Sequence, residues 1–186
     1  MRKFTTLILC LSLTIAATAQ IDIVSSGASY ANQGFYNLAD GETRSNVHTS
    51  WDIAFSVAPQ TAGIFINEAI AASFAAPLPG VELYESIATD FATADTTSHL
   101  VGRIYNDEKS WTEGGFNHVK NESDPFDYGW GSYDMTTHFV NGSAVYIANL
   151  DGEYYKLFIN HLKSGEYTFQ YEKMVSGGTL VQKTIT

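Results

Sequence analysis

Residues 136–172 of the chain read TTHFVNGSAVYIANLDGEYYKLFINHLKSGEYTFQYE. Aromatic and β-branched residues alternate here with polar ones in short runs, and Asn141-Gly142, Asp151-Gly152 and Lys163-Ser164-Gly165 separate the runs. Asn-Gly and Asp-Gly favour two-residue type I′ hairpin turns, because both central residues of that turn need a positive φ. This stretch therefore predicts an antiparallel β meander.

The turn positions define the expected strands. Asn141-Gly142 and Asp151-Gly152 are each predicted to close a hairpin, and Ser176-Gly177-Gly178 is expected to precede the last strand. The predicted strands, in order, are 136–140, 143–150, 153–162, 166–172 and 179–186.

Two-residue turns also predict the register, with Val140 opposite Ser143 and Leu150 opposite Glu153. Strict alternation then separates two faces. The outward face is expected to carry His138, Val145, Ile147, Asn149, Tyr154, Lys156, Phe158 and Asn160. The core face is expected to carry Phe139, Ala144, Tyr146, Ala148, Leu150, Tyr155, Leu157, Ile159 and His161. His138 and His161 are therefore predicted to lie on opposite faces.

The remainder of the chain shows the same short β pattern. Further strands are expected at 21–25, 34–38, 50–57, 62–67 and 81–84. The alanine-rich segment 68–76 has a weak helical pattern, which Pro77 and Pro79 end. The predicted fold class is all-β, an antiparallel meander or sandwich with little helix.

The first residues have the form of an export signal. Arg2 and Lys3 precede an apolar run over 4–15, and Ala17-Thr18-Ala19 offers a small-x-small cleavage site. We expect a signal peptide at 1–19, followed by one β domain at 20–186 in a protein that is secreted or held at the outer-membrane surface. The strand-like end of the chain leaves two alternatives, an edge strand or a domain whose next strand belongs to a longer protein.

Composition excludes several functions. Without Arg2 and Lys3, eight basic residues remain against 20 acidic ones, a formal net charge of −12. Nucleic acid is not an expected partner, because its phosphates require basic residues. The only cysteine, Cys10, lies in the signal peptide, so disulfides and thiolate zinc sites are excluded from the mature chain. No other run approaches the roughly 20 apolar residues of a transmembrane helix.

Residues 106–134 change character. This segment has no strand or helix period, and its aromatic residues stand among glycines, acids and His118. They are Trp111, Phe116, Phe126, Tyr128, Trp130 and Tyr133. Two interpretations remain open: a long functional loop, and an Ω-loop that its aromatic residues pin over one end of the sheet.

Four segments of the chain resemble the HmuY family of the Bacteroidetes. They are YANQGFYNL at 30–38, WDIAF at 51–55, GWGSYDMTTH at 129–138 and DGEYYKL at 151–157. The resemblance implies an all-β fold and a secreted or surface haemophore, which captures haem for iron acquisition and passes it to an outer-membrane receptor. Similar flavobacterial sequences form the front part of larger cargo proteins of the type nine secretion system. Haem ligands in the family are histidine pairs or methionines.

A haem site needs a flat apolar slot with axial ligands on the iron. The candidate ligands are His48, His99, His118, His138, His161, Met135 and Met174. The predicted register separates His138 from His161, which leaves His118 and His138 as the favoured pair and Met135 as a substitute. Trp111, Phe116 or Trp130 are expected to stack on the porphyrin. For each lone histidine, the competing interpretation is a hydrogen-bonded surface or core-edge residue.

Other ligands remain possible in the same loop. Glu122, Asp124, Asp127 and Asp134 offer oxygen ligands for calcium, without EF-hand spacing. A carbohydrate-binding module would need exposed Trp111 and Trp130. A structural or adhesive surface module without haem is the further alternative.

Catalytic patterns are missing from the sequence. It has no Gly-x-Ser-x-Gly elbow, His-Glu-x-x-His pair or phosphate-binding glycine loop. The carboxylates of Asp52, Glu82 and Asp90 fall on different predicted elements. We therefore expect a binding protein and no enzyme active site.

Overall fold

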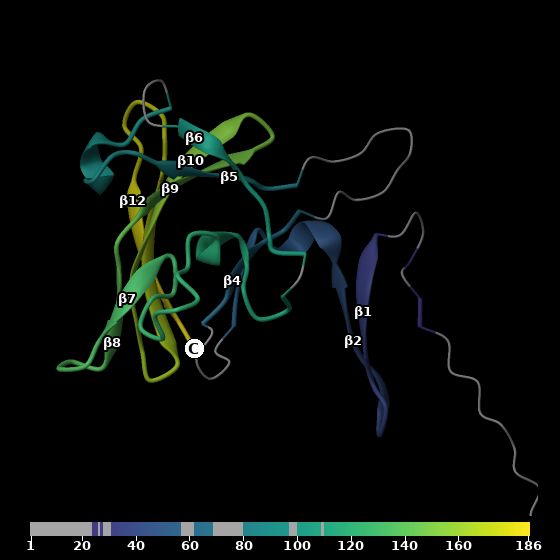
Figure 1. Ribbon diagram of the computed structural model, residues 1–186. Helices are drawn as coiled ribbons and strands as arrows, with labels where there is room; N and C mark the ends of the chain where they lie inside the picture. The colour runs from purple at the N-terminus through teal and green to yellow at the C-terminus, as the bar shows by residue number, and fades with distance from the viewer. Residues whose placement is uncertain are drawn as a thin grey trace, which may run out of the picture.

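The computed structural model describes residues 24–25, 27, 31–56, 62–68, 80–96, 100–108 and 110–186. In these residues the chain forms strands and short 3-10 helices, and the predicted all-β class with little helix is confirmed (Figure 1). The predicted signal peptide at 1–19 lies outside the described residues. His99 and residues 69–76 of the expected helical segment lie outside them as well.

The described strands form three antiparallel sheets. One is the hairpin of β1 (Asn32–Asn37) and β2 (Gly41–Val47), and another pairs β3 (Ile53–Phe55) with β4 (Ile64–Ile66). The third has eight strands: β5 (Glu82–Ser86), β6 (Leu100–Ile104), β7 (Gly131–Asp134), β8 (Phe139–Gly142), β9 (Val145–Leu150), β10 (Glu153–Lys163), β11 (Glu166–Lys173) and β12 (Leu180–Ile185).

The large sheet has the order β12-β11-β10-β9-β5-β6, while β8 pairs with the far end of β10 and β7 pairs with β8. β9 to β12 are neighbours in chain order, so the predicted meander is confirmed for its last four strands. Three strands were not predicted: β2, β6 and β7. β2 reads GETRSNV, a polar sequence of low β-propensity that pairs through its backbone with β1.

The Asp151-Gly152 turn is confirmed with its register. Asp151 and Gly152 have φ values of 52° and 88°, Leu150 lies opposite Glu153, and Val145 lies opposite Phe158. Ser164 and Gly165 form a second turn of this kind, with φ values of 51° and 84°. Left-handed backbone at both positions of each turn is the geometry that these residue types favour.

The hairpin predicted at Asn141-Gly142 is wrong. β8 and β9 both run antiparallel to β10, with Asn141 opposite His161 and Val145 opposite Phe158. They form one interrupted strand, and β8 makes its hairpin with β7 instead. A Cβ at Gly142 would overlap the carbonyl oxygen of Ile159. Glycine is needed here because two backbones approach closely, a role that Asn-Gly does not reveal in sequence.

The predicted positions of both histidines are wrong as well. The β10–β11 register shifts between Ile159 and His161, which turns Leu162 into the core and His161 outward. His161 packs there against Phe139 in a tilted arrangement, with ring centroids 5.0 Å apart. His138 lies in the β7–β8 turn with a φ of 60°, outside any strand.

The core face was predicted in part. Tyr146, Ala148, Leu157 and Ile159 lie in the hydrophobic core. Val145 and Ile147, expected to face outward, are buried too. The segment after β5 contacts this side of the sheet through η3 (Phe91–Thr93), and the Lys156 ammonium lies 4.8 Å from the Phe91 ring centre. β9 is therefore buried on both faces.

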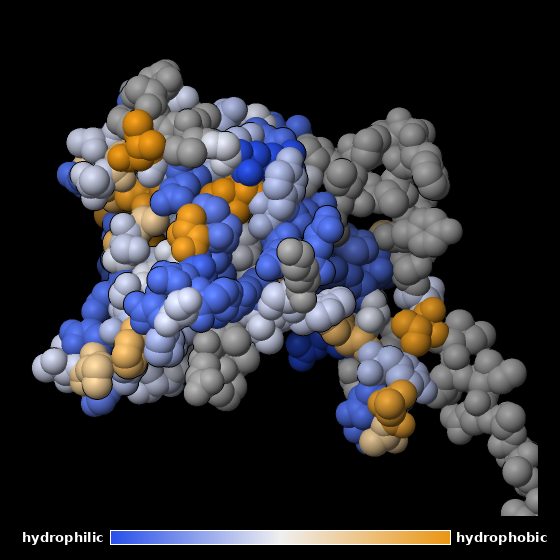
Figure 2. Space-filling view, viewed as in Figure 1, coloured by the Kyte–Doolittle hydropathy of each residue, from blue (hydrophilic) through white to orange (hydrophobic). Residues whose placement is uncertain are grey.

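The face of the molecule drawn in Figure 2 is mostly polar. Figure 2 shows the apolar residues of one face in small separate patches among hydrophilic ones. Scattered single apolar residues are ordinary for a protein surface and do not by themselves indicate a binding site.

We predict that Gly142→Ala destabilises the protein by about 2 kcal/mol or more, because the methyl group has to displace β10 at Ile159. Gly102→Ala is the matched control: Gly102 also lies in a strand, and nothing lies within 4 Å of the place that its added Cβ would take. Its unfolding free energy should change by less than about 0.5 kcal/mol. Urea unfolding measures both, and equal effects would contradict the close approach.

Candidate functional site

Asn117 anchors the long aromatic segment to β4. It lies in η4 (Gly115–Asn117) and is 4% exposed. Its Oδ1 accepts hydrogen bonds from the backbone N–H of Ile64 at 3.1 Å and of Gly114 at 3.0 Å, and its Nδ2 donates to the carbonyl of Tyr128 at 2.9 Å. One buried amide therefore links three parts of the chain.

Asn106 forms a similar set of hydrogen bonds two residues further along β4, at Ile66. Its Oδ1 accepts from the N–H of Ile66 at 3.0 Å and of Gly115 at 2.9 Å, while its Nδ2 donates to the carbonyl of Ile66 at 2.7 Å. β3 occupies the other edge of β4. The two asparagines thus supply the hydrogen bonds that a neighbouring strand would supply.

Aromatic residues hold the same segment in the core. The Trp130 indole N–H donates to the carbonyl of Ala62 at 3.1 Å, and the Tyr146 hydroxyl donates to the carbonyl of Phe116 at 3.3 Å. Burial of the Tyr146 phenol raises its pKa well above the usual value, so the hydroxyl stays protonated and remains a donor. These contacts pin the segment to the core, and they do not choose between the two interpretations that the sequence left open.

The predicted stacking residues divide into buried and exposed. Phe116 and Trp130 are fully buried in the core, where no ligand reaches them from solvent. Trp111 is 96% exposed, and Met135 in the β7–β8 turn is 69% exposed. The structure does not bring these four side chains together around one slot.

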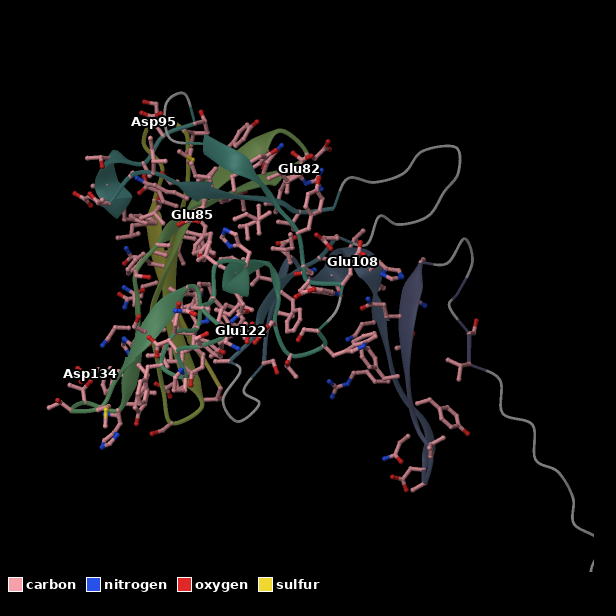
Figure 3. All side chains as sticks on the ribbon, in the orientation of Figure 1. Glu82, Glu85, Asp95, Glu108, Glu122 and Asp134 are labelled. Carbon is pink, nitrogen blue, oxygen red and sulfur yellow. The ribbon has the colours of Figure 1, made fainter. Side chains whose placement is uncertain are left out.

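The predicted haem-ligand pair is also separated. His118 Nε2 lies 3.2 Å from the Glu85 carboxylate on β5, whereas His138 Nδ1 lies 2.7 Å from the Tyr133 hydroxyl and its backbone N–H donates to Asp134. Figure 3 shows Glu85 and Asp134 far apart along the molecule. His118 and His138 therefore do not face one another across a porphyrin-sized slot.

Three of the four acids proposed for calcium, Asp124, Asp127 and Asp134, accept hydrogen bonds within the loop. Asp124 accepts from the N–H of Phe126, and Asp127 accepts from those of Asn121 and Gly129. Hydrogen bonds from Thr136 and Thr137 lower the pKa of Asp134. Among the described residues no group of three or more acids, histidines or cysteines is arranged to hold a metal ion. The described residues therefore offer no ligand set for the calcium site that the sequence suggested.

A cavity lies on this loop. It has a volume of about 370 Å³ and is lined by Lys120, Glu122, Asp124, Pro125, Phe126, Tyr128 and Tyr133. A second cavity of about 240 Å³ is lined by Tyr105, Asp107, Glu113, Gly114, Asn117, His118, Lys120 and Glu122. Because Lys120 and Glu122 line both, the two cavities adjoin. We call them together the loop groove.

Phe126 and Tyr133 form an aromatic wall of the loop groove. Their rings are nearly parallel, with centroids 5.8 Å apart and an interplanar angle of 12°. The Tyr133 N–H donates to the Phe126 carbonyl at 2.8 Å, which holds the two residues opposite each other. Phe126 is 41% exposed, so its ring remains accessible to a ligand.

Lys120 lies where the two cavities meet. Its ammonium is in close contact with the Glu113 carboxylate and lies 3.6 Å from that of Glu122. The hydrogen bond with Glu113 raises the pKa of Lys120, which keeps the ammonium charged at neutral pH. The side chains of Lys120 and Glu113 are mostly buried, whereas that of Glu122 is 75% exposed. The Lys120–Glu113 pair therefore neutralises itself and leaves Glu122 facing solvent.

Sequence patterns did not single out Asn106, Asn117, Lys120 or Glu113. A buried asparagine that replaces a strand carries no spacing signal, because its partners lie as many as 53 positions away along the chain. Phe126 and Tyr133 were recognised as part of the aromatic segment, without a reason to prefer them over the tryptophans.

Comparison with known proteins adds no relative: no protein-family model, curated protein or solved structure matches the chain. No helix among the described residues is long and apolar enough to cross a membrane. The geometry of the loop groove is therefore the basis for a functional proposal.

We predict that Asn117→Ala lowers the unfolding free energy by about 3 kcal/mol, since it leaves two buried N–H groups and one carbonyl without partners. Asn117→Asp keeps the acceptor but loses the donor to Tyr128 and buries a carboxylate, so it should also destabilise the protein. Asn121→Ala is the control, because Asn121 caps an exposed turn through Ser123 and should cost about 0.5 kcal/mol. Urea unfolding compares the three, and an equal cost at both positions would exclude the anchoring role.

Proposed function

We propose that this chain is an exported binding protein that holds a carbohydrate in the loop groove. The carrying observation is the accessible, stacked Phe126–Tyr133 pair on the wall of a cavity of about 370 Å³. Ligand sites combine apolar and aromatic walls with a few placed polar groups, and this cavity has both.

The chemistry of the walls suits a sugar. One face of a pyranose ring is made of C–H groups, and it packs on an aromatic face such as that of Phe126. Sugar hydroxyls donate to carboxylates, which Glu122 and Asp124 provide. The sequence-based expectation of a carbohydrate site on exposed Trp111 and Trp130 is not met, because Trp130 is buried. The aromatic contact thus comes from different residues than the tryptophans expected from sequence.

Location and charge are consistent with this proposal. The signal-like residues 1–19 favour export, and surface glycans are ligands available outside the cell. The 20 acidic residues against ten basic ones oppose a nucleic-acid ligand for the same aromatic wall.

We predict that Phe126→Ala weakens the binding of oligosaccharides about tenfold, because stacking and apolar burial on the ring are lost. Trp111→Ala is the matched control, since Trp111 is highly exposed in the same segment and lines neither cavity. Titration of a panel of oligosaccharides into labelled protein, followed by backbone chemical shifts, measures both affinity and site.

Shifts confined to the loop groove and lost in Phe126→Ala would support the proposal. The proposal fails if no saccharide of the panel shifts residues of the groove. Loss of binding in Trp111→Ala with Phe126→Ala unaffected would also contradict it, because the sugar would then sit on the exposed tryptophan.

The second candidate function is haem binding, with an outer-membrane receptor as the protein's partner. One observation favours the β7–β8 turn as the position of the haem. Met135 and His138 are both exposed in the β7–β8 turn, and the contact of His138 Nδ1 with Tyr133 leaves Nε2 as the atom that could reach an iron. The geometry does not fit a clamp between His118 and His138. Haem bound here would be held from the turn alone.

The second candidate predicts that hemin added to the protein gives a sharp Soret band that His138→Ala abolishes. His118→Ala should leave the band unchanged, because His118 is paired with Glu85 elsewhere in the structure. A spectrum identical to that of free hemin would exclude haem binding, and equal loss in both variants would restore the two-histidine clamp.

A further inference from the structure

We infer that the loop groove selects a ligand that carries an ammonium group, such as an amino sugar with a free amine. This inference rests on the proposed function and names the class of saccharide. It follows from the charges that line the larger cavity and from the aromatic faces beside them.

The positive charge of the groove is already paired. The Lys120 ammonium contacts the Glu113 carboxylate, and the two side chains are 14% and 16% exposed. A ligand carboxylate would have to compete with Glu113 for that ammonium in a largely desolvated place. Lys120 therefore serves as part of the wall, and an anionic sugar finds no unpaired cation among the residues that line the larger cavity.

The negative charges of the larger cavity are open. Glu122 is exposed and lies 3.6 Å from Lys120, a contact that it shares with the closer Glu113. Asp124 is exposed and accepts the N–H of Phe126 with Oδ1, and no cation among the described residues pairs with it. Two carboxylates therefore face the space beside the aromatic wall, where they attract a cation.

The aromatic wall favours the same charge. Aromatic faces carry partial negative charge and attract ammonium groups within about 6 Å of the ring centre. Phe126, Tyr128 and Tyr133 all line the larger cavity. A neutral sugar gains stacking and hydroxyl hydrogen bonds, whereas an amino sugar gains two kinds of electrostatic attraction in addition. A uronic acid gains stacking against repulsion from both carboxylates.

Three trisaccharides of matched length test the inference: a glucosamine trimer, its fully N-acetylated form and a galacturonic acid trimer. Titrations at pH 6 keep the amines of the glucosamine trimer largely charged and the carboxylates of the galacturonic acid trimer ionised. We expect the free amine to bind about tenfold more tightly than the acetylated form, from two partly exposed charge contacts and the ring faces. The galacturonic acid trimer should bind most weakly.

Charge-removing variants assign the preference to the groove. Asp124→Asn keeps the oxygen that accepts from Phe126 and removes only the charge, and Glu122→Gln is equally conservative. Each variant should reduce the ratio of the affinities for the free-amine and acetylated trimers about threefold. An effect of this size is expected of one exposed charge pair. Glu166→Gln, an exposed acid at the start of β11, is the control and should leave the preference unchanged.

The outcomes separate the inference from the proposed function. Equal affinity for the free and acetylated trimers overturns the inference and leaves carbohydrate binding standing. If no saccharide binds, the proposed function is overturned. Titration with tetramethylammonium chloride then tests whether the loop groove binds an ammonium group. Chemical-shift changes at Phe126 and Tyr133 on adding that salt would support the site, and unchanged shifts would overturn it.

Discussion

The free edge of β4 is the constraint on which the rest of the structure depends. β3 pairs with one edge, and the N–H groups of Ile64 and Ile66 on the other edge are satisfied by the side-chain amides of Asn117 and Asn106. Buried N–H groups without partners are costly, so these contacts determine where the long aromatic segment lies. The backbone of Gly114 passes so close to the Ile64 carbonyl that a side chain there would overlap it.

The loop groove is a consequence of that anchoring. Asn117 also binds the carbonyl of Tyr128, which sets the course of the chain before β7. The pairing of Asp127 with Ser132 and the bond from Tyr133 to Phe126 then place the two rings side by side. Under the proposed function, a wall held in this way would need little reordering on binding, which would reduce the entropy cost.

The histidines show how one local irregularity changes a functional interpretation. Alternation along β10 predicts His161 in the core, but the register shift after Ile159 exchanges its place with Leu162. His138 belongs to the β7–β8 turn because β8 starts only at Phe139 and pairs with β7. The error at His161 arises from that register shift. The error at His138 arises from the predicted Asn141-Gly142 hairpin, because Gly142 marks close backbone contact with β10 instead. A haem-ligand pair that is chosen by assuming ideal alternation is therefore wrong where the register shifts.

The sequence by itself determined the all-β class, the β9 to β12 meander and the turns at Asp151-Gly152 and Ser164-Gly165. These features depend on neighbouring residues, since period-two alternation and positive φ are local properties. Tertiary structure alone decided that Trp130 is buried, that Asn106 and Asn117 replace a strand, and that Lys120 meets Glu113 beside the stacked rings. These depend on which backbone and side-chain groups lack partners once the sheets pack, a condition that no local pattern records.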